Sequence, residues 1–348
     1  MPYSITPADL DRDKQEILAL WKRNFPNIPE ERYDWIYKNN PAGPASCWLL
    51  KETRQNKVVG ATALFPRRMF CEGKRITAGI AGDFVIDKEH RTLGPALLLQ
   101  KTTLSNGSKK PFNVLYGFPN KMSELVLLKA GYKILGEVNS LTRPLKSYYY
   151  LKRRANLPLI TKPISFLVDL GLKISSKERY FKNSEYEFEA LTSFDQRFDT
   201  FWNSVTGQIP MIGERTCSYL NWRYIQSPHK KHQVFALILK RNRNITGYIV
   251  YNIIDNKTYI DDILSVNLNE ALDSLLSGFI LYQRAKAIDA ISISFIGSKA
   301  LMEKLKKYSF SLRDNSAKII KYSAPGSKDL LDVLDKRKWY LFPGDNDI

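Results

Sequence analysis

One aromatic motif occurs twice in the chain, and this repeat constrains the fold more than any other feature of the sequence. The motif W-x-Y-x-x-x-P begins at Trp35 and begins again at Trp222, 187 residues further on. Other positions match at the same offset, among them Gly60 with Gly247. In each half, an apolar segment, a polar turn and a second apolar segment follow the motif, which is the pattern of a β-hairpin. Because matches at one offset without a gap indicate a duplication, we expect two domains of similar fold.

The order of predicted helices and strands also indicates two domains. In the first half, strands are predicted at 3–6, 47–51, 58–65, 82–87, 112–118 and 132–142, and helices at 9–24, 29–38, 95–105 and 121–130. In the second half, strands are predicted at 186–190, 234–240, 245–254, 258–266 and 290–295, and helices at 194–205, 215–225, 268–287 and 299–308. We therefore predict an α/β fold with mixed sheets, a first domain at 1–145, a linker at 146–185 and a second domain at 186–348.

The charge balance favours an anionic partner. The 348 residues include 53 Lys and Arg against 35 Asp and Glu, a formal net charge of +18. Such a surplus suits the phosphates of a cofactor, nucleic acid, an acidic polymer or a membrane surface, although a basic composition without specific purpose would look the same. No zinc-finger, RNP-like or helix-turn-helix pattern accompanies the charge, so we expect no sequence-specific binding of nucleic acid.

The cysteines and the N-terminus exclude other classes of protein. The three cysteines are far apart and form no C-x-x-C pair, and the chain has only three histidines. We therefore expect neither a metal site nor a disulfide framework. The N-terminus lacks the pattern of a signal peptide, and no apolar run reaches the ~18 residues of a membrane-spanning helix. These features predict a cytoplasmic protein.

The segment 84–99 gives the clearest indication of a binding site. An apolar, strand-like run ends in a polar turn that contains Arg91, and an apolar helix follows Gly94. The first backbone N–H groups of a helix have no partner within it, and the helix dipole adds partial positive charge. The small residues Gly94 and Ala96 would let a phosphate approach these groups, and Arg91 could donate a charge-assisted hydrogen bond. The segment therefore predicts a phosphate site.

The pattern Arg91-x-x-Gly94-x-Ala96 resembles the R/Q-x-x-G-x-G/A signature of the GNAT acyltransferases, which bind acyl-CoA. Two later features resemble the same superfamily, namely Asn120 after the next predicted strand and an Ala-Gly-Tyr step at 130–132. These segments are also similar to those of GNAT-related proteins often found with bacterial surface polysaccharide genes. The resemblance implies two tandem GNAT-like domains and acyl-CoA as a co-substrate.

The resemblance covers 3–145 well and 186–325 only by the order of elements. It implies that the strand at 84–86 separates from the strand at 115–118, with the pantetheine of acyl-CoA in the gap. The residues that would bind the cofactor are Val85, Ile86, Arg91, Thr92, Leu93, Gly94, Ala96 and Asn120. Pro95 has no N–H group, which leaves one contact fewer than the pattern allows.

The position of the usual catalytic acid departs from the family pattern. Many GNAT proteins carry a tyrosine in the helix after the asparagine, as the acid for the departing thiolate, and this chain has Leu127 there. Because leucine cannot donate a proton, Tyr116 or Tyr132 would serve, or transfer proceeds without an acid, or transfer does not occur. Acyl transfer to an amine also needs a base, and Asp83 is the first candidate.

The second half lacks the phosphate-binding loop. Its corresponding segment, 263–273, has no glycine and contains two carboxylates, which would repel a pyrophosphate at a helix start. We therefore expect acyl-CoA only in the first domain. The linker at 146–185 is aromatic and basic, with nine basic against two acidic residues between Lys146 and Lys182. It would either pack between the domains or contact the inner membrane face peripherally.

Three functions are consistent with these patterns. The first is an N-acyltransferase that moves an acetyl or other acyl group from acyl-CoA to an amine, such as an amino sugar or a polysaccharide precursor. The second is a peptidoglycan-bridge type of transferase that uses aminoacyl-tRNA, which the positive charge favours and the loop at 91–96 disfavours. The third is a non-catalytic scaffold that binds CoA, which Leu127 favours. We take the first as the prediction.

Overall fold

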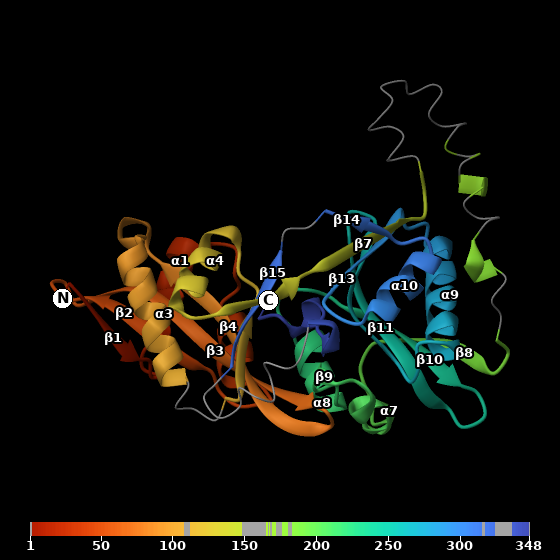
Figure 1. The fold of residues 1–348 in the computed structure, drawn as a ribbon, viewed down its shortest axis with the longest axis horizontal. Coiled ribbons are helices and arrows are strands. Elements are labelled where there is room, and N and C mark those ends of the chain that lie inside the picture. Colours follow the sequence, from red (N-terminus) through yellow and green to blue (C-terminus); the bar gives the residue numbers. More distant parts are fainter. Residues whose placement is uncertain are drawn as a thin grey trace.

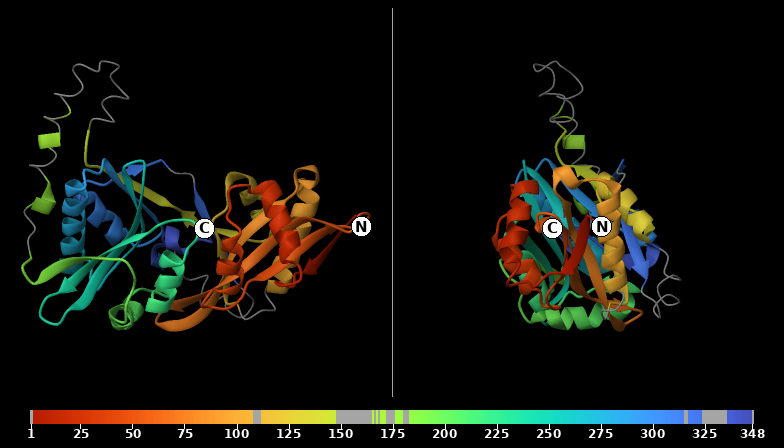
Figure 2. Two further views of the ribbon diagram at one scale, coloured as in Figure 1. Left: turned by 180° about the vertical axis from the view of Figure 1, so that it is seen from behind. Right: turned by 90° about the vertical axis from the view of Figure 1, so that its left-hand side faces the viewer.

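A computed structural model shows two domains side by side, with the C-terminus between them (Figure 1, Figure 2). Each domain is built on its own mixed β-sheet, and helices pack on the sheets. The residues that the structure describes are 2–107, 112–147, 165, 167, 169–171, 176–179, 183–314, 317–323 and 336–347. The predicted α/β class with mixed sheets is confirmed.

The first sheet contains nine of the described strands. Seven of them follow one another across the sheet in the order β1 (Tyr3–Pro7), β2 (Ser46–Glu52), β3 (Lys57–Cys71), β4 (Lys74–Ile86), β5 (Val114–Gly117), β15 (Lys318–Ser323) and β6 (Lys133–Glu137). Two short strands extend the sheet, because β9 (Met211–Gly213) pairs with β3 and β16 (Trp339–Tyr340) pairs with β9. β4 and β5 pair in parallel, as do β9 and β16, while the other described neighbours are antiparallel.

The second sheet contains seven of the described strands. They follow one another in the order β14 (Ser311–Arg313), β7 (Asn139–Pro144), β13 (Ala290–Phe295), β12 (Lys257–Ser265), β11 (Asn244–Ile254), β10 (Gln233–Leu239) and β8 (Tyr186–Leu191). Only β12 and β13 are parallel among these described neighbours. Each sheet therefore has a parallel pair near its middle, β4 with β5 and β12 with β13, that is joined over four residues.

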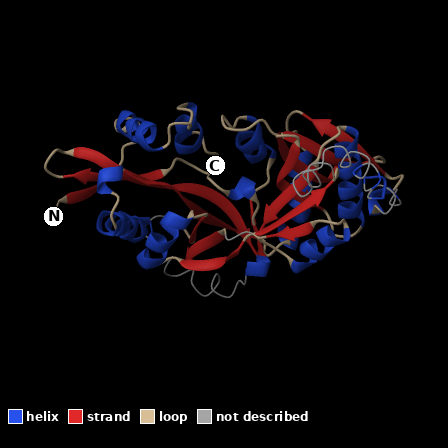
Figure 3. Ribbon diagram, turned by 90° about the horizontal axis from the view of Figure 1, so that it is seen from above, coloured by secondary structure: helices blue, strands red, loops and turns tan. Residues whose placement is uncertain are grey.

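Helices lie on both faces of the first sheet, with α1 on one side and α3 and α4 on the other (Figure 2, Figure 3). The described helices are α1 (Lys14–Asn24), α2 (Glu31–Tyr33), α3 (Leu93–Gly107), α4 (Lys121–Ala130), α7 (Arg197–Val205), α8 (Cys217–Leu220), α9 (Glu270–Ala285) and α10 (Lys299–Lys307). The shorter turns are η1 (Asp34–Lys38), η2 (Lys88–His90), η3 (Lys177–Arg179), η4 (Thr206–Gln208), η5 (Asn221–Ile225), η6 (Lys336–Lys338) and η7 (Pro343–Asp345). The helix predicted at 29–38 is α2 followed by the π-helical turn η1.

The register of the two hairpins confirms the repeat predicted from the sequence. Leu50 pairs with Gly60 in the first hairpin, and Leu237 pairs with Gly247 in the second. Each ladder shifts its register directly after Leu50 or Leu237. A Cβ added to Gly60 would lie 3.0 Å from a carbonyl oxygen of the next strand, and one added to Gly247 would lie 3.1 Å from the corresponding oxygen. Both halves use glycine here because a neighbouring backbone passes too close for a side chain.

The repeated tryptophans contact each other across the boundary between the domains. The indole rings of Trp35 and Trp222 stack with centroids 4.9 Å apart. Nε1 of Trp35 donates to the carbonyl of Trp222 at 2.8 Å, and Nε1 of Trp222 donates to the carbonyl of Trp35 at 3.1 Å. Two copies related by a twofold axis make reciprocal contacts of this kind. The repeated motif that indicates the duplication therefore also joins the two domains.

The two domains also exchange strands. β7 precedes residue 145, but it pairs with β13 and β14 in the second sheet. β15 comes from the last part of the chain and lies between β5 and β6 in the first sheet (Figure 1). Each sheet thus includes a strand from beyond the boundaries predicted at 145 and 186. Strand exchange ties the domains together, since separating them would open both sheets.

Several strands differ from their predicted limits, and β3 continues to Cys71 rather than ending at 65. β4 begins at Lys74 rather than at 82, and a two-residue turn, Glu72-Gly73, joins it to β3. Both turn residues have a positive φ, +47° and +76°, as a type I′ hairpin turn requires. The strand predicted at 132–142 is two strands, β6 and β7, because the chain passes from the first sheet to the second at Val138.

Most of the predicted linker at 146–185 lies outside the described residues. In its described part, Glu178 of η3 is buried and accepts hydrogen bonds from Arg143 at 2.6 Å and from Arg284 at 3.2 Å. Within the described residues, no helix is both long enough and apolar enough to cross a bilayer. The same residues contain no cluster of His, Cys, Asp and Glu side chains that could bind a metal ion.

Replacing Trp35 with phenylalanine is expected to lower the free energy of unfolding by about 1–3 kcal/mol. The phenyl ring keeps most of the apolar contact, but it leaves the buried carbonyl of Trp222 without its donor. Trp339→Phe is the matched control, because Trp339 is also buried and its Nε1 has no partner among the described residues. Urea unfolding measures both variants. Equal losses in the two would show that the reciprocal hydrogen bonds contribute nothing.

Candidate active site

β4 and β5 lie side by side over only part of their length. They pair as far as Ala81 and Gly117, and β4 continues to Ile86 without a described partner on that side. Just beyond the last pair, Asp83 has a φ of +49°, and the β3–β4 ladder shifts its register there. A bulge of this kind bends a strand and increases its twist, which parts it from its neighbour. The predicted separation of 84–86 from the next strand is confirmed.

A cavity of about 460 Å³ opens at this separation. Its size lies in the range of small-molecule and cofactor sites. The residues that line it are Asn24, Phe25, Phe84, Val85, Ile86, Arg91, Thr92, Leu93, Ala96, Asn120, Met122, Ser123 and Val126. All of the predicted cofactor-binding residues except Gly94 are among them. The structure therefore brings together residues of β4, α3 and α4 that the sequence analysis assigned to one ligand.

The N-terminus of α3 lies at this cavity and leaves part of its backbone open. A Cβ added to Gly94 would have no atom within 4 Å. The amide of Thr92 donates to the carbonyl of His90 at 2.8 Å, and the amide of Ala96 donates to the carbonyl of Thr92 at 3.4 Å. The amides of Leu93 and Gly94, which belong to the predicted cofactor-binding residues, have no acceptor among the described residues. These two N–H groups remain for an anion at the helix terminus.

Arg91 is folded back onto the end of β4. Its Nε and Nη2 donate to the carbonyl of Ile86 at 3.2 and 3.0 Å, and Nη2 also donates to Oδ1 of Asn24 at 3.0 Å. These acceptors are neutral, whereas a phosphate oxygen would form a stronger, charge-assisted hydrogen bond. Because Arg91 also lines the cavity, a small rotation would let it contact an anionic ligand.

Asn120 connects the end of the β5 segment to α4. Its Oδ1 accepts hydrogen bonds from the amides of Met122 at 3.0 Å and Ser123 at 2.9 Å, which makes it the N-cap of the helix. The cap uses the oxygen and leaves the side-chain NH₂ group for a ligand. Asn120 therefore both fixes the start of α4 and faces the cavity.

The structure brings neither Tyr116 nor Tyr132, the two tyrosines considered as proton donors, to the cavity wall, and Leu127 does not line it either. Leu127 is buried between α3, α4 and the sheet. Tyr116 is fully buried, its hydroxyl donates to the carbonyl of Asp345 at 2.9 Å, and burial raises its pKa well above its ordinary value. Tyr132 is buried against Tyr322, burial raises its pKa as well, and its hydroxyl has no partner among the described residues.

Asp83 lies at the bulge in a buried, charged cluster. Its Oδ2 accepts hydrogen bonds from Nη1 of Arg32 at 2.7 Å and from the hydroxyl of Tyr37 at 2.9 Å. Arg32 also donates from Nη2 to the backbone carbonyl of Asp347 at 3.0 Å. Asp83 therefore adjoins Phe84, which lines the cavity, but its own side chain faces α2 and η1.

The second sheet has the same strand separation, and the C-terminal segment of the chain fills it. β12 pairs with β13 only as far as Ile260. Beyond that point the hydroxyl of Tyr340 donates to the carbonyl of Ile263, and Leu341 forms a β-bridge with Ile296. The place that corresponds to the first cavity is therefore occupied by protein. This occupation favours the expectation that acyl-CoA binds only to the first domain.

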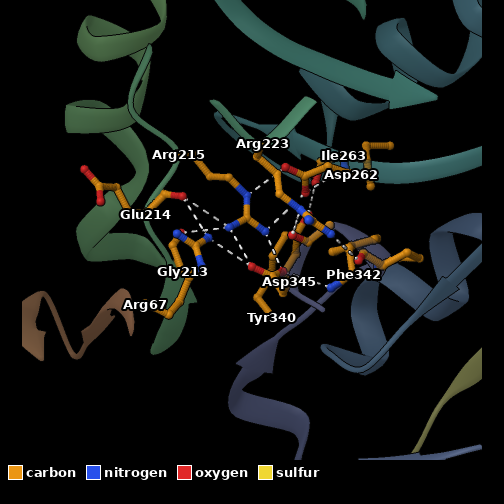
Figure 4. A network of polar contacts seen from close by, with 12 residues as sticks. Arg67, Gly213, Glu214, Arg215, Arg223, Asp262, Ile263, Tyr340, Phe342 and Asp345 are labelled. Carbon is orange, nitrogen blue, oxygen red and sulfur yellow. Dashed lines mark hydrogen bonds and ion pairs between the residues drawn. The ribbon is translucent and has the colours of Figure 1, made fainter. Parts of the chain in front are cut away.

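Four buried charges fix the same C-terminal segment between the domains (Figure 4). Nη2 of Arg215 donates to Asp345 at 2.6 Å, and Nε of Arg215 donates to Asp262 at 2.7 Å. Nη2 of Arg67, from the first sheet, donates to Asp345 at 3.0 Å. All four side chains are buried, so the C-terminal segment is held by both sheets at once.

No protein-family model matches the sequence, and no curated protein matches it. Solved structures do match. A protein from Enterococcus faecalis V583, described as a probable N-acyltransferase, matches with a TM-score of 0.68 at 13% identity, over 93% of this chain and 73% of that chain. A tandem GNAT protein from the clavulanic acid biosynthesis pathway, solved without AcCoA, matches with a TM-score of 0.57 at 10% identity, over 92% of this chain and 98% of that chain. The chain has the tandem GNAT fold.

A third solved structure supports the same assignment of the GNAT fold. A GCN5-related N-acetyltransferase from Anabaena variabilis ATCC 29413 matches with a TM-score of 0.65 at 17% identity, over 92% of this chain and 73% of that chain. At these identities the similarity establishes the arrangement of helices and strands. It does not by itself assign a substrate.

Several residues that line the cavity were not predicted from the sequence. Asn24 is the last residue of α1 and Phe25 follows it, 67 and 66 residues before Arg91, and no local pattern marks them. Ser123 and Val126 follow Asn120 at helical spacing on α4, so the predicted helix would have placed them beside Asn120. Phe84 directly precedes two residues that were predicted.

Proposed function

We propose that the protein transfers an acyl group from acyl-CoA to a primary amine, and that the first domain alone holds the CoA. The observation that supports this most directly is the cavity at the β4–β5 separation, which places unpaired strand backbone and the N-terminus of α3 around one space. An extended amide chain suits the unpaired strand, and a pyrophosphate suits the helix terminus. Acyl-CoA combines these two chemical features.

Different residues of the cavity would bind different parts of the proposed ligand. The backbone of Val85 and Ile86 would bind the pantetheine, and the amides of Leu93 and Gly94 with the guanidinium of Arg91 would bind the pyrophosphate. Apolar side chains of the cavity would exclude water from the thioester. The printed names of the similar structures, N-acyltransferase and N-acetyltransferase, support acyl transfer as the reaction class.

For the acceptor we propose an amino sugar or another amine-bearing precursor of a polysaccharide. The resemblance of the Asn120 region to proteins associated with surface polysaccharide genes supports this class. The positive charge of the chain would suit an acceptor that carries a phosphate or a carboxylate.

Calorimetric titration with CoA and acetyl-CoA, followed by thiol release with a panel of primary amines that includes amino sugars, tests the proposal. We expect binding in the micromolar to low millimolar range and release of thiol that depends on the amine. Binding without release for any amine would favour a scaffold. Transfer that occurs only with aminoacyl-tRNA would favour the peptidoglycan-bridge type of enzyme. Absence of binding to either nucleotide contradicts the proposal.

A further inference from the structure

We infer that Asp347, close to the C-terminus of the chain, is the general base that accepts a proton from the amine, an inference that rests on the proposed function. The sequence pointed to Asp83 for this role. The structure places the carboxylates of Asp83 and Asp347 at the same bulge of β4 but gives them different partners. Three observations distinguish them: their position relative to the cavity, their hydrogen bonds, and the segment that holds them.

The carboxylate of Asp347 lies over the residue at which the two strands begin to separate. Gly82 directly follows Ala81, the last residue of β4 that pairs with β5. A Cβ added to Gly82 would come within 2.0 Å of Oδ2 of Asp347. Only glycine leaves room for the carboxylate at this point. The carboxylate therefore lies two residues along β4 from Phe84, which lines the cavity.

Two side chains donate hydrogen bonds to the carboxylate of Asp83, whereas the carboxylate of Asp347 accepts one from its own backbone amide. The guanidinium of Arg32 and the hydroxyl of Tyr37 both donate to one oxygen of Asp83, at 2.7 and 2.9 Å. Two donors therefore already occupy this oxygen of Asp83, which leaves it less accessible to an incoming amine. The carboxylate of Asp347 has no ion pair among the described residues, since Arg32 contacts only its backbone carbonyl at 3.0 Å.

The surroundings of Asp347 also suit a base that works near neutral pH. The charged groups that face it are Asp83 on β4, Arg32 on α2 and Arg223 on η5. Burial and the charge of Asp83 raise the pKa of Asp347 to about 6, against the opposing effect of the two arginines. Such a group is mostly deprotonated at pH 7 and is basic enough to accept a proton.

The C-terminal segment holds Asp347 firmly in this position. Asp345, two residues earlier, is paired with Arg67 and Arg215. Directly before Asp345, the carbonyl of Gly344 accepts a hydrogen bond from Nε of Arg223 at 2.7 Å. A catalytic group needs a rigid support of this kind, because small displacements reduce the rate strongly. The C-terminal segment, which fills the strand separation of the second sheet, thus places a carboxylate beside the first sheet.

The proposed step is balanced as follows. The nitrogen of the amine attacks the thioester carbonyl and forms the new C–N bond, while Asp347 takes the N–H proton. The tetrahedral intermediate then collapses, the C–S bond breaks with its electron pair on sulfur, and Asp347 passes the proton it took from the amine to the thiolate. The products are the amide and free CoA, and Asp347 returns to its carboxylate form.

The test compares Asp347→Asn with the wild-type protein, using acetyl-CoA and the amine that gives the fastest thiol release. We expect kcat to fall about 100-fold at pH 7 with CoA affinity unchanged, which is the size of a general-base contribution. The ratio of the two rates at each pH cancels the titration of the amine itself. The wild-type rate divided by the variant rate should rise as pH increases through about 6 and should stay constant above it, because Asp347 loses its proton there. Asp314→Asn, at an exposed aspartate, is the matched control.

Gly82→Ala provides an independent variant that keeps the carboxylate but displaces it. Its added methyl group occupies the place of Oδ2, so we expect kcat to fall at least 10-fold. The methyl group also comes within 2.9 Å of the buried ring of Phe65, so the melting temperature should fall as well. A wild type that releases no thiol overturns the proposed function and this inference together. A fully active Asp347→Asn variant, or a rate ratio that does not change with pH, overturns this inference alone. If the pH dependence of the rate were lost only in the Asp83→Asn variant, the general base would be Asp83.

Discussion

Replacing Asp345 with asparagine is expected to lower the free energy of unfolding by about 3–5 kcal/mol. The side chain of Asp345 is completely buried, and it accepts hydrogen bonds from Arg67 at 3.0 Å and Arg215 at 2.6 Å. Asparagine has nearly the same shape but no charge, so the two guanidiniums would share Asp262 as their remaining buried counter-charge. Removing one partner of a buried ion pair costs this much because an uncompensated charge stays behind.

The effect of Asp345→Asn should depend on pH. Burial alone would raise the pKa of Asp345, but Arg215 and Arg67 outweigh it and lower the pKa below 3.8. Since the pKa is lower in the folded than in the unfolded state, the stabilisation is complete above about pH 4 and is lost as pH falls further. The difference between the wild type and the variant should therefore shrink in acid. Urea unfolding at pH 7 and at pH 3 measures both predictions.

Asp289→Asn is the matched control for this result. Asp289 pairs with Lys146 at 3.4 Å, and both side chains are partly exposed. Exposed ion pairs contribute about 0–1 kcal/mol, so this variant should be close to the wild type. If both variants lost the same small amount, the buried network would not be what holds the C-terminal segment between the domains.

Local patterns in the sequence predicted local structure well. The helix predicted at 121–130 has these limits in α4, because Asn120 caps its start and Gly131, with a φ of +130°, ends it. The loop at 91–96 was predicted as a phosphate site for the same reason, since a strand end, a glycine and a helix start are consecutive in the chain. Both predictions depend only on residues that are close in sequence.

Contacts between distant segments were beyond sequence reasoning. β15 joins β5 and β6 in a sheet whose other main strands lie before residue 138, and its six residues carry no sign of that partner. The tail that places Asp347 over Gly82 depends on pairing with both domains. The repeat indicated that two domains exist, but only the structure shows that Trp35 and Trp222 contact each other reciprocally.

The same distinction applies to the catalytic residues. Asp83 was chosen because it stands at the start of the strand predicted at 82–87, and the structure places it at the bulge of β4. Its two hydrogen-bond donors, Arg32 and Tyr37, belong to a helix and a π-helical turn some fifty residues earlier. Whether a carboxylate is engaged or available depends on such partners, so sequence proximity could identify the place but not the group.

Replacing Gly94 with aspartate is expected to weaken CoA binding more than 100-fold without harm to the fold. The position has no atom within 4 Å of an added Cβ, so the side chain meets no obstacle. An acidic residue in the first turn of α3 is favourable for the helix itself, because it interacts with the positive end of the dipole. The same negative charge occupies the space intended for the pyrophosphate and repels it.

The Gly94→Asn variant separates the effect of charge from the effect of size, because asparagine is nearly as large as aspartate but carries no charge. We expect this variant to bind CoA much more tightly than Gly94→Asp, and the gap between them should narrow at high salt as the repulsion is screened. Calorimetric titration with CoA at two salt concentrations measures both. Pro95 already removes one amide from this helix start, so the N–H groups of Leu93 and Gly94 have few substitutes. If both variants bound CoA like the wild type, the anion would have to bind elsewhere, and the N-terminus of α3 would have no part in holding it.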